Sequence, residues 1–146
     1  MVKNVYSLRQ NDDATQFVFF SEGRKGRIMK AVIISPYDGN RWNLAFGDVQ
    51  PDGEINDSAF SNNQDVAKVI GSVAQAAIIF SENHPGCKLV IFPVDEKRRR
   101  LYNLVFRRRL AEIRPFFEIW GKRGPSWEAY NPELEYDAFE ILRKPG

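Results

Sequence analysis

The sequence contains only one cysteine and one histidine among its 146 residues. A single thiol, Cys87, excludes an intrachain disulfide and agrees with a reducing compartment. No run of apolar residues reaches the roughly 20 residues that a membrane-spanning helix needs. The first residues, Met1–Gln10, lack the apolar core of a secretion signal. These absences predict a cytoplasmic protein that has no membrane segment.

The sequence also lacks a recognisable catalytic set. His84 has no nucleophile or orienting partner nearby in the sequence, and its place before Pro85 favours a helix C-cap. Cys87 enters an apolar strand, which favours packing as a small hydrophobic side chain over a role as nucleophile. The carboxylates do not recur with the spacing of a metal site. We therefore expect no catalytic residue, no metal and no cofactor.

The sequence also lacks a large excess of either charge. It has 21 Lys and Arg residues and 19 Asp and Glu residues, which give a net charge of +2. With 43% hydrophobic and 13% aromatic residues, the chain has the composition of an ordered globular protein. Its length favours one domain with a substantial core. A surface for a polyanion must therefore come from local clustering of cations.

Local patterns predict six strands and two helices, and leave either a last strand or a short helix open at Glu135–Leu142. β-Branched and aromatic residues between turn residues predict strands at Val5–Leu8, Phe17–Phe20, Arg27–Ser35, Arg41–Val49, Lys88–Phe92 and Phe116–Trp120. Apolar residues at three- and four-residue steps predict helices over Gln64–Glu82 and Asp95–Arg114. Asn62 or Asn63 would cap the first helix.

Strands linked by hairpins precede a helix, a strand, a helix and a strand, an order typical of the α+β class. We predict an antiparallel β-sheet of about 5–6 strands with two α-helices packed on one face, in the order ββββ-α-β-α-β. Residues 1–121 would form this single domain. Residues 122–146 would form a C-terminal extension packed on it.

The helix expected over Asp95–Arg114 carries most of the clustered cations. Its apolar residues share one face, and Arg100, Arg107 and Arg114 follow at seven-residue steps on the opposite face. Residues 97–100 are all Lys or Arg and crowd the first turn, where the helix dipole disfavours positive charge. Such a conflict with local stability is typical of a functional surface.

Three stretches carry a resemblance to a known family. Asn43–Asp48 reads NLAFGD, Asn62–Asp65 reads NNQD, and Arg98–Tyr102 reads RRRLY. In this order and spacing, the chain resembles a family of small bacterial proteins, common in Bacteroidota, known only as a domain of unknown function. The resemblance covers about residues 5–121, and residues 127–146 lie outside it. It implies a single intact domain and names no reaction or substrate.

The arginines allow two interpretations. They could contact phosphates and bind a nucleic acid in a salt-sensitive way. They could instead be a solvated helix face that pairs with acids of the tail, namely Glu133, Glu135 and Asp137. Helical phase places Arg98 and Arg109 beside the apolar stripe, so each would need a partner such as Asp48 or Asp65.

Two smaller features are also open to two interpretations. The polar residues Asp48, Asn62, Asn63 and Asp65 could face the arginines as a site, although turn and capping roles are favoured. Aromatic residues near Lys122 and Arg123 could stack on unpaired bases, although packing in the core or on the sheet is commoner.

These observations predict a small binding protein for RNA or single-stranded DNA. Its nucleic-acid contacts would be Arg98, Arg99, Arg100, Arg107, Arg108 and Arg114, helped by Arg24 and Lys25 at a hairpin tip. An alternative is a protein-interaction component, for example of a toxin–antitoxin or phage-defence pair, that meets an acidic partner protein. A purely structural arginine network, or an endoribonuclease that uses the arginines and His84, are further alternatives.

Overall fold

The computed structural model describes residues 4–56 and 65–145. Within these residues the strands are β1 (Arg9–Gln10), β2 (Gln16–Gly23), β3 (Gly26–Asp38), β4 (Arg41–Val49), β5 (Ile55–Asn56), β6 (Lys88–Ile91), β7 (Phe117–Arg123), β8 (Ser126–Ala129) and β9 (Ala138–Arg143). The helices are α1 (Val66–Asn83), α2 (Glu96–Arg108) and the short α3 (Leu110–Ile113). Five of the six expected strands overlap these elements, whereas the expected strand at Val5–Leu8 precedes the two-residue β1.

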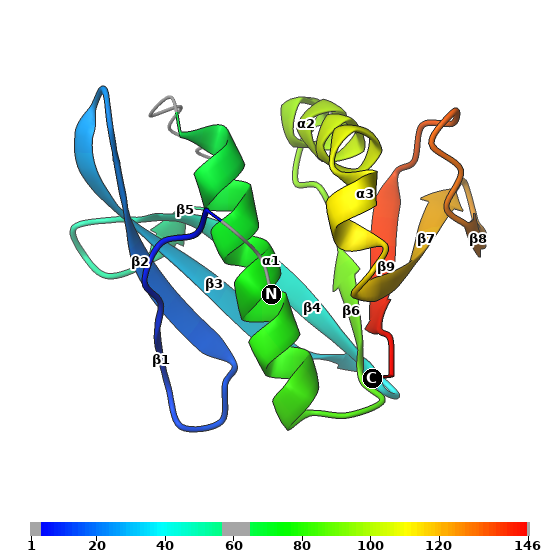
Figure 1. Cartoon of the computed structure of the whole chain (residues 1–146), viewed down its shortest axis with the longest axis horizontal. Helices are drawn as coiled ribbons and strands as arrows, with labels where there is room; N and C mark the ends of the chain where they lie inside the picture. The colour runs from blue at the N-terminus through cyan, green and yellow to red at the C-terminus, as the bar shows by residue number, and fades with distance from the viewer. Residues whose placement is uncertain (1–3, 57–64, 146) are drawn as a thin grey trace.

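The described strands form one mixed sheet (Figure 1). Eight of them follow the order β1-β2-β3-β4-β6-β9-β7-β8, and β5 pairs with β4 beside this path. β4 and β6 are parallel, whereas the other neighbouring strands are antiparallel. The expected antiparallel sheet of 5–6 strands with two helices is therefore wrong. The sheet has more strands and a parallel pair, and there is a third helix.

The parallel pair follows from the place of α1 in the chain, between β4 and β6. A helix that crosses over the sheet returns the chain to the edge where the previous strand began, so the next strand can run in the same direction. Residues 41–43 accordingly pair with residues 88–90. Periodicity along the sequence predicts a strand at residues 88–92 but carries no information about its partner.

The C-terminal segment expected as an extension supplies part of the sheet. β8 and β9 both come from residues after 121, and β9 lies between β6 and β7. Residues 138–141 are buried on both faces of the sheet, so β9 does not show the alternation of apolar and polar residues that marks a strand with one wet face. This burial is the reason why the local pattern underestimates its role.

The helices cover one face of the sheet, where α1 and the α2–α3 pair lie side by side (Figure 1). α1 places Val69, Ala76 and Phe80 in the core. They face a layer of fully or almost fully buried strand residues that includes Phe17, Phe19, Val32, Leu44 and Leu89. Asp65 occupies the N-cap position of α1, and the expected caps Asn62 and Asn63 lie outside the described residues. No helix among the described residues is long and apolar enough to span a membrane.

The helix expected over Asp95–Arg114 is divided in two. α2 ends at Arg108, and Arg109 has φ −105° and ψ 15°, outside the helical region, before α3 begins. At the other end, the side chain of Asp95 accepts a hydrogen bond from the backbone N–H of Arg98 at 2.7 Å. This cap satisfies one of the free N–H groups of the first turn and places negative charge at the positive end of the helix.

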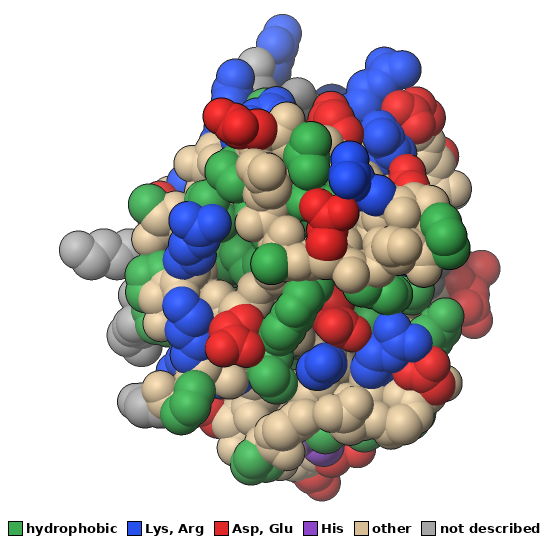
Figure 2. Space-filling view, turned by 90° about the vertical axis from the view of Figure 1, so that its right-hand side faces the viewer, with side chains coloured by type: hydrophobic (Ala, Val, Ile, Leu, Met, Phe, Trp, Pro, Cys, Tyr) green, Lys and Arg blue, Asp and Glu red, His purple; other side chains and the backbone are tan. Residues whose placement is uncertain are grey.

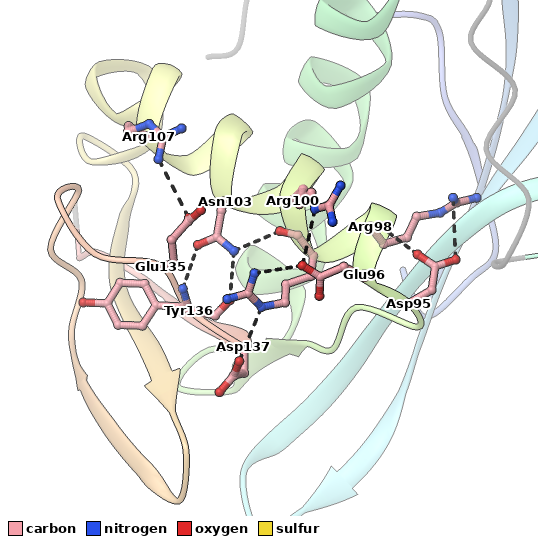
Figure 3. A network of polar contacts seen from close by, with 10 residues as sticks. Asp95, Glu96, Arg98, Arg100, Asn103, Arg107, Glu135, Tyr136 and Asp137 are labelled. Atoms are coloured by element: carbon pink, nitrogen blue, oxygen red, sulfur yellow. Dashed lines mark hydrogen bonds and ion pairs between the residues drawn. The ribbon is translucent and has the colours of Figure 1, made fainter.

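The side chain of Asn103 joins α2 to the C-terminal segment (Figure 3). It donates to the backbone oxygen of Tyr136 at 2.8 Å and accepts from the backbone N–H of the same residue at 2.8 Å. Both Asn103 and Tyr136 are buried. The phenol of Tyr136 donates to Glu128 and accepts from the N–H of Asn131. The segment before β9 is thus fixed to α2 by a closed set of polar contacts.

Burial of tyrosines predicts a loss of stability in alkaline solution. Burial raises the pKa of Tyr136 above its ordinary value of 10.0, and the hydrogen bond to Glu128 raises this pKa further. Above about pH 10 the unfolded chain therefore loses this proton more readily than the folded chain, so stability falls as pH rises. Urea unfolding between pH 8 and 11 should show a shallower decline for Tyr136→Phe than for the wild type. Equal declines would contradict the prediction.

Candidate functional site

The predicted site centres on the cations of α2. One of them, Arg98, is not part of the exposed surface of this helix. The Arg98 side chain is buried, and its guanidinium lies 3.9 Å from the carboxylate of Asp95. The expected partners, Asp48 and Asp65, are engaged elsewhere among the described residues. Asp48 pairs with Lys30, and Asp65 accepts from the hydroxyls of Tyr6 and Ser21. Arg98 therefore has a structural position and is not available to a ligand at the surface.

The next two arginines, Arg99 and Arg100, share one acidic partner at the start of α2, Glu96. Arg99 lies 3.3 Å from Glu96 and 3.4 Å from Asp137, so it joins the first turn of α2 to the C-terminal segment. Arg100 lies 3.4 Å from the same Glu96 and remains largely exposed. The crowding of cations in this turn is thus offset by Asp95 and Glu96, which place carboxylates beside them.

Further along the helix, Arg107 lies 3.8 Å from Glu135. Of the tail acids expected as partners, Glu135 and Asp137 thus form ion pairs with arginines of α2. Arg109, at the break between the helices, lies 3.2 Å from Glu112 of α3. These pairs have at least one largely exposed member, and exposed pairs of this kind contribute about 0–1 kcal/mol each.

Three cations of the segment make no ion pair with any residue that the structure describes. They are Lys97, Arg108 and Arg114, and all three are exposed. On α2, Lys97, Arg100, Arg107 and Arg108 fall within an arc of about 100° around the helix axis, because each residue advances by about 100°. Arg114 follows directly after α3. We call Lys97, Arg100, Arg107, Arg108 and Arg114 the α2–α3 cationic face.

The surface around α2 and the C-terminal strands is mixed in charge. Figure 2 shows Lys and Arg side chains interspersed with Asp and Glu instead of one uninterrupted basic patch. Arg24 and Lys25, which were expected to add nucleic-acid contacts, lie at the β2–β3 turn and not on α2. In Figure 1 this hairpin and α2 lie on opposite sides of α1. The structure does not bring the two groups of cations into one continuous surface.

The other residues considered from the sequence occupy structural positions. His84 is the C-cap of α1, its ring stacks on Phe80 with 4.4 Å between centroids, and its Nε2 lies 2.7 Å from the backbone oxygen of Asp13. Cys87 is a free, partly buried thiol. Within residues 4–56 and 65–145, no three His, Cys, Asp or Glu side chains are grouped so as to hold a metal ion.

The aromatic side chains near cations are also accounted for by packing. Trp42 packs on Phe80 in the core, with 5.2 Å between the ring centroids. Trp120 lies beneath the ammonium group of Lys88, which is 4.9 Å from the ring centroid. Arg41 lies over Trp127 at 5.9 Å. The cations near both tryptophans come from the protein's own strands, so these rings are not an open stacking surface.

Sequence reasoning missed a buried ion pair on the helix-covered face of the sheet. Lys30 of β3 and Asp48 of β4 are opposite one another, and Lys30 Nζ lies 2.5 Å from Asp48 Oδ1. Lys30 is 1% exposed and Asp48 7%. On the neighbouring strand β2, the hydroxyl of Ser21 donates to Asp65 at 2.6 Å. The sequence signal that could have revealed this pair is a charged residue at an inward-facing position in each of two adjacent strands.

Comparisons with known proteins give one match. A family model described as "Family of unknown function (DUF6934)" matches residues 2–144. Comparison with curated proteins and with solved structures gave no match. The family match extends past residue 121, so it includes the segment that the sequence motifs had left outside their resemblance.

Proposed function

The chain belongs to DUF6934, a family of unknown function, and from its surface we propose that the protein binds RNA or single-stranded DNA through the α2–α3 cationic face. The observation that carries the proposal is the exposure of Lys97, Arg108 and Arg114 without an ion pair to any described residue. Positive charge left in solvent attracts phosphates and releases their counterions.

The paired arginines of this face remain usable by a ligand. The side chain of Arg100 is 75% exposed and that of Arg107 is 46% exposed. Their carboxylate partners are both more than half exposed. Such pairs contribute little to stability, so a phosphate can replace the carboxylate at low cost. Arg98 and Arg99 are excluded from the proposed contacts, because one is buried and the other ties Glu96 to Asp137.

The spacing of the cations favours a flexible ligand. Lys97 and Arg108 are separated by about 16 Å along the helix axis, at 1.5 Å per residue. Acidic residues interrupt the cations, as the mixed surface in Figure 2 shows. A single strand can adjust its backbone so that phosphates meet separated cations, whereas a duplex presents its phosphates at fixed spacing. We therefore expect tighter binding to single strands than to duplexes of equal length.

The test is fluorescence anisotropy with labelled single- and double-stranded oligonucleotides across a salt series. Arg108→Glu/Arg114→Glu should weaken single-strand binding about tenfold or more, and should reduce the salt slope by about 1.4 through the loss of two phosphate contacts. Arg9→Glu/Arg27→Glu, with the same change in net charge on β1 and β3, is the matched control and should bind as the wild type does. Absence of wild-type binding at low salt, or equal effects of both doubles, would refute the proposal.

A second candidate function, interaction with another protein, is supported by the alternation of acids and bases on the surface near α2 (Figure 2). Complementary patterns of charge give specificity between proteins. Recovery of one stoichiometric acidic partner that the Arg108→Glu/Arg114→Glu double fails to retain, together with no oligonucleotide binding, would favour this function over the first.

A further inference from the structure

A cleft lies between the two helices on the sheet, on the opposite side of α2 from the cationic face. Its walls are α1 and α2–α3, with Val73, Ala74, Val105 and Ile113 among the lining residues. Its floor includes Leu44 of β4 and Ile91 of β6. The cleft has a volume of about 80 Å³ and opens partly to solvent.

The chemistry of the lining restricts what can enter. All of the described lining residues are hydrophobic, and none presents a polar atom to the cleft. A ligand group that needs hydrogen bonds would lose its water there without compensation. Several of the lining side chains, among them Ile70, Val73 and Val105, are only partly buried by the protein itself. The part of a ligand that lies in this cleft must therefore be hydrocarbon.

A charged group stands at one end of the apolar space. A second hollow of about 50 Å³ shares Ile70, Ala74, Ile113 and Phe117 with the cleft, so the two lie next to one another. Arg109 and Glu112 line this second hollow, whose other described lining residues carry no charge. Helical phase already places Arg109 beside the apolar stripe of α2, and the helix break follows at this residue.

From this arrangement we propose that the cleft binds an amphiphile with one acyl chain and an anionic head, of the kind represented by a medium-chain fatty acid. The chain lies between α1 and α2, and the head group meets the guanidinium of Arg109. Arg109 is held 3.2 Å from Glu112, whose side chain is 65% exposed. The head group replaces Glu112 as the partner of Arg109, and Glu112 turns into solvent, where an ionised carboxylate is well hydrated.

The first experiment measures binding of octanoate, nonanoate and decanoate to the full chain by calorimetry. Each added methylene that becomes buried should tighten the dissociation constant about fourfold. Ala74→Leu, which fills the cleft, should weaken decanoate binding at least tenfold. Ala111→Leu, at an exposed position of α3, is the matched control and should bind as the wild type does. Val73→Phe is a second filling variant if Ala74→Leu does not fold.

The second experiment tests the head group with decanol, which has the same chain and no charge. Arg109→Gln should weaken decanoate binding about tenfold and leave decanol binding unchanged, whereas Arg9→Gln should alter neither. Absence of decanoate binding, binding that ignores the filling variants, or equal effects of Arg109→Gln on acid and alcohol would overturn the proposal. Sedimentation is run in parallel, since a dimer that Ala74→Leu dissociates, without fatty acid binding, would assign the cleft to a second copy of the chain. Ala74→Leu should bind oligonucleotides as the wild type does. This control distinguishes the cleft from the α2–α3 cationic face.

Discussion

Replacing Gly121 by alanine is expected to destabilise the fold by about 3 kcal/mol. Gly121 lies in β7, opposite Phe139 of β9 and Glu128 of β8. A Cβ atom at this position would overlap the ring of Tyr136. That ring is fully buried, and its backbone and hydroxyl are held by Asn103, Glu128 and Asn131. It has no direction in which to withdraw.

The expectation is opposite in sign to the usual effect of the substitution. Where the backbone and the space permit a side chain, Gly→Ala stabilises by about 0.4–1 kcal/mol, because it restricts the unfolded chain. Overpacking a well-filled site costs about 1–3 kcal/mol and sometimes more. Thermal unfolding should therefore show a fall in Tm of the order of 10 °C for Gly121→Ala.

Two further variants identify the cause. Glu118→Ala changes an exposed residue of the same strand and should shift Tm by only a few degrees at most. In a Tyr136→Leu background, Gly121→Ala should cost much less than it does alone, because the ring it overlaps is gone. A wild-type Tm for Gly121→Ala, or additive effects in the double variant, would contradict the overlap with Tyr136.

Removal of Asp48 is the second change expected to have a large effect, with a loss of about 3–5 kcal/mol for Asp48→Ala. Lys30 is 1% exposed and donates to Asp48 at 2.5 Å. Without this carboxylate the buried ammonium group of Lys30 loses an ion-pair partner at hydrogen-bond distance, and removal of one member of a buried ion pair is strongly unfavourable. Urea unfolding measures the loss as a decrease in the midpoint concentration.

The double variant Lys30→Met/Asp48→Leu should be far less destabilised than Asp48→Ala, although it removes both members of the pair. Apolar residues of similar volume avoid the desolvation of two charges, so such replacements are often neutral or stabilising. Arg123→Ala, which removes a pair with Glu128 at the surface, is the control and should cost less than about 1 kcal/mol. An Asp48→Ala variant as stable as the wild type would show that the pair does not matter to the fold.

The pair also shows where prediction from the sequence succeeds and where it ends. Residues 41–49 were expected as a strand and form β4 with the same bounds, because apolar and polar residues alternate there. The helix expected at 64–82 corresponds to α1 at 66–83. Local periodicity is sufficient for these elements. It is silent about pairing, so it did not place Lys30 opposite Asp48.

Long-range contacts explain the errors in topology and in the candidate site. Glu140 in β9 lies 3.6 Å from Arg41 of β4 and 3.8 Å from Lys88 of β6, so a charged residue is held inside the sheet by partners from distant strands. The same applies to α2. Its amphipathic pattern placed Arg98 beside the apolar stripe and left pairing with tail acids as one of two interpretations, but it could not decide that Arg98 is buried or that Arg99 pairs with Asp137. A cation count along one helix does not reveal which cations the rest of the fold has already neutralised.

The place of β9 has a consequence for how the protein is made. Ribosomes release the chain from its N-terminus, yet β6 and β7 have no strand between them until residues 138–143 emerge. Until then β6 and β7 each have an edge with unpaired amide and carbonyl groups, and each edge can pair with a strand from another molecule. Of the described strands, the last to leave the ribosome is the one that joins the two parts of the sheet.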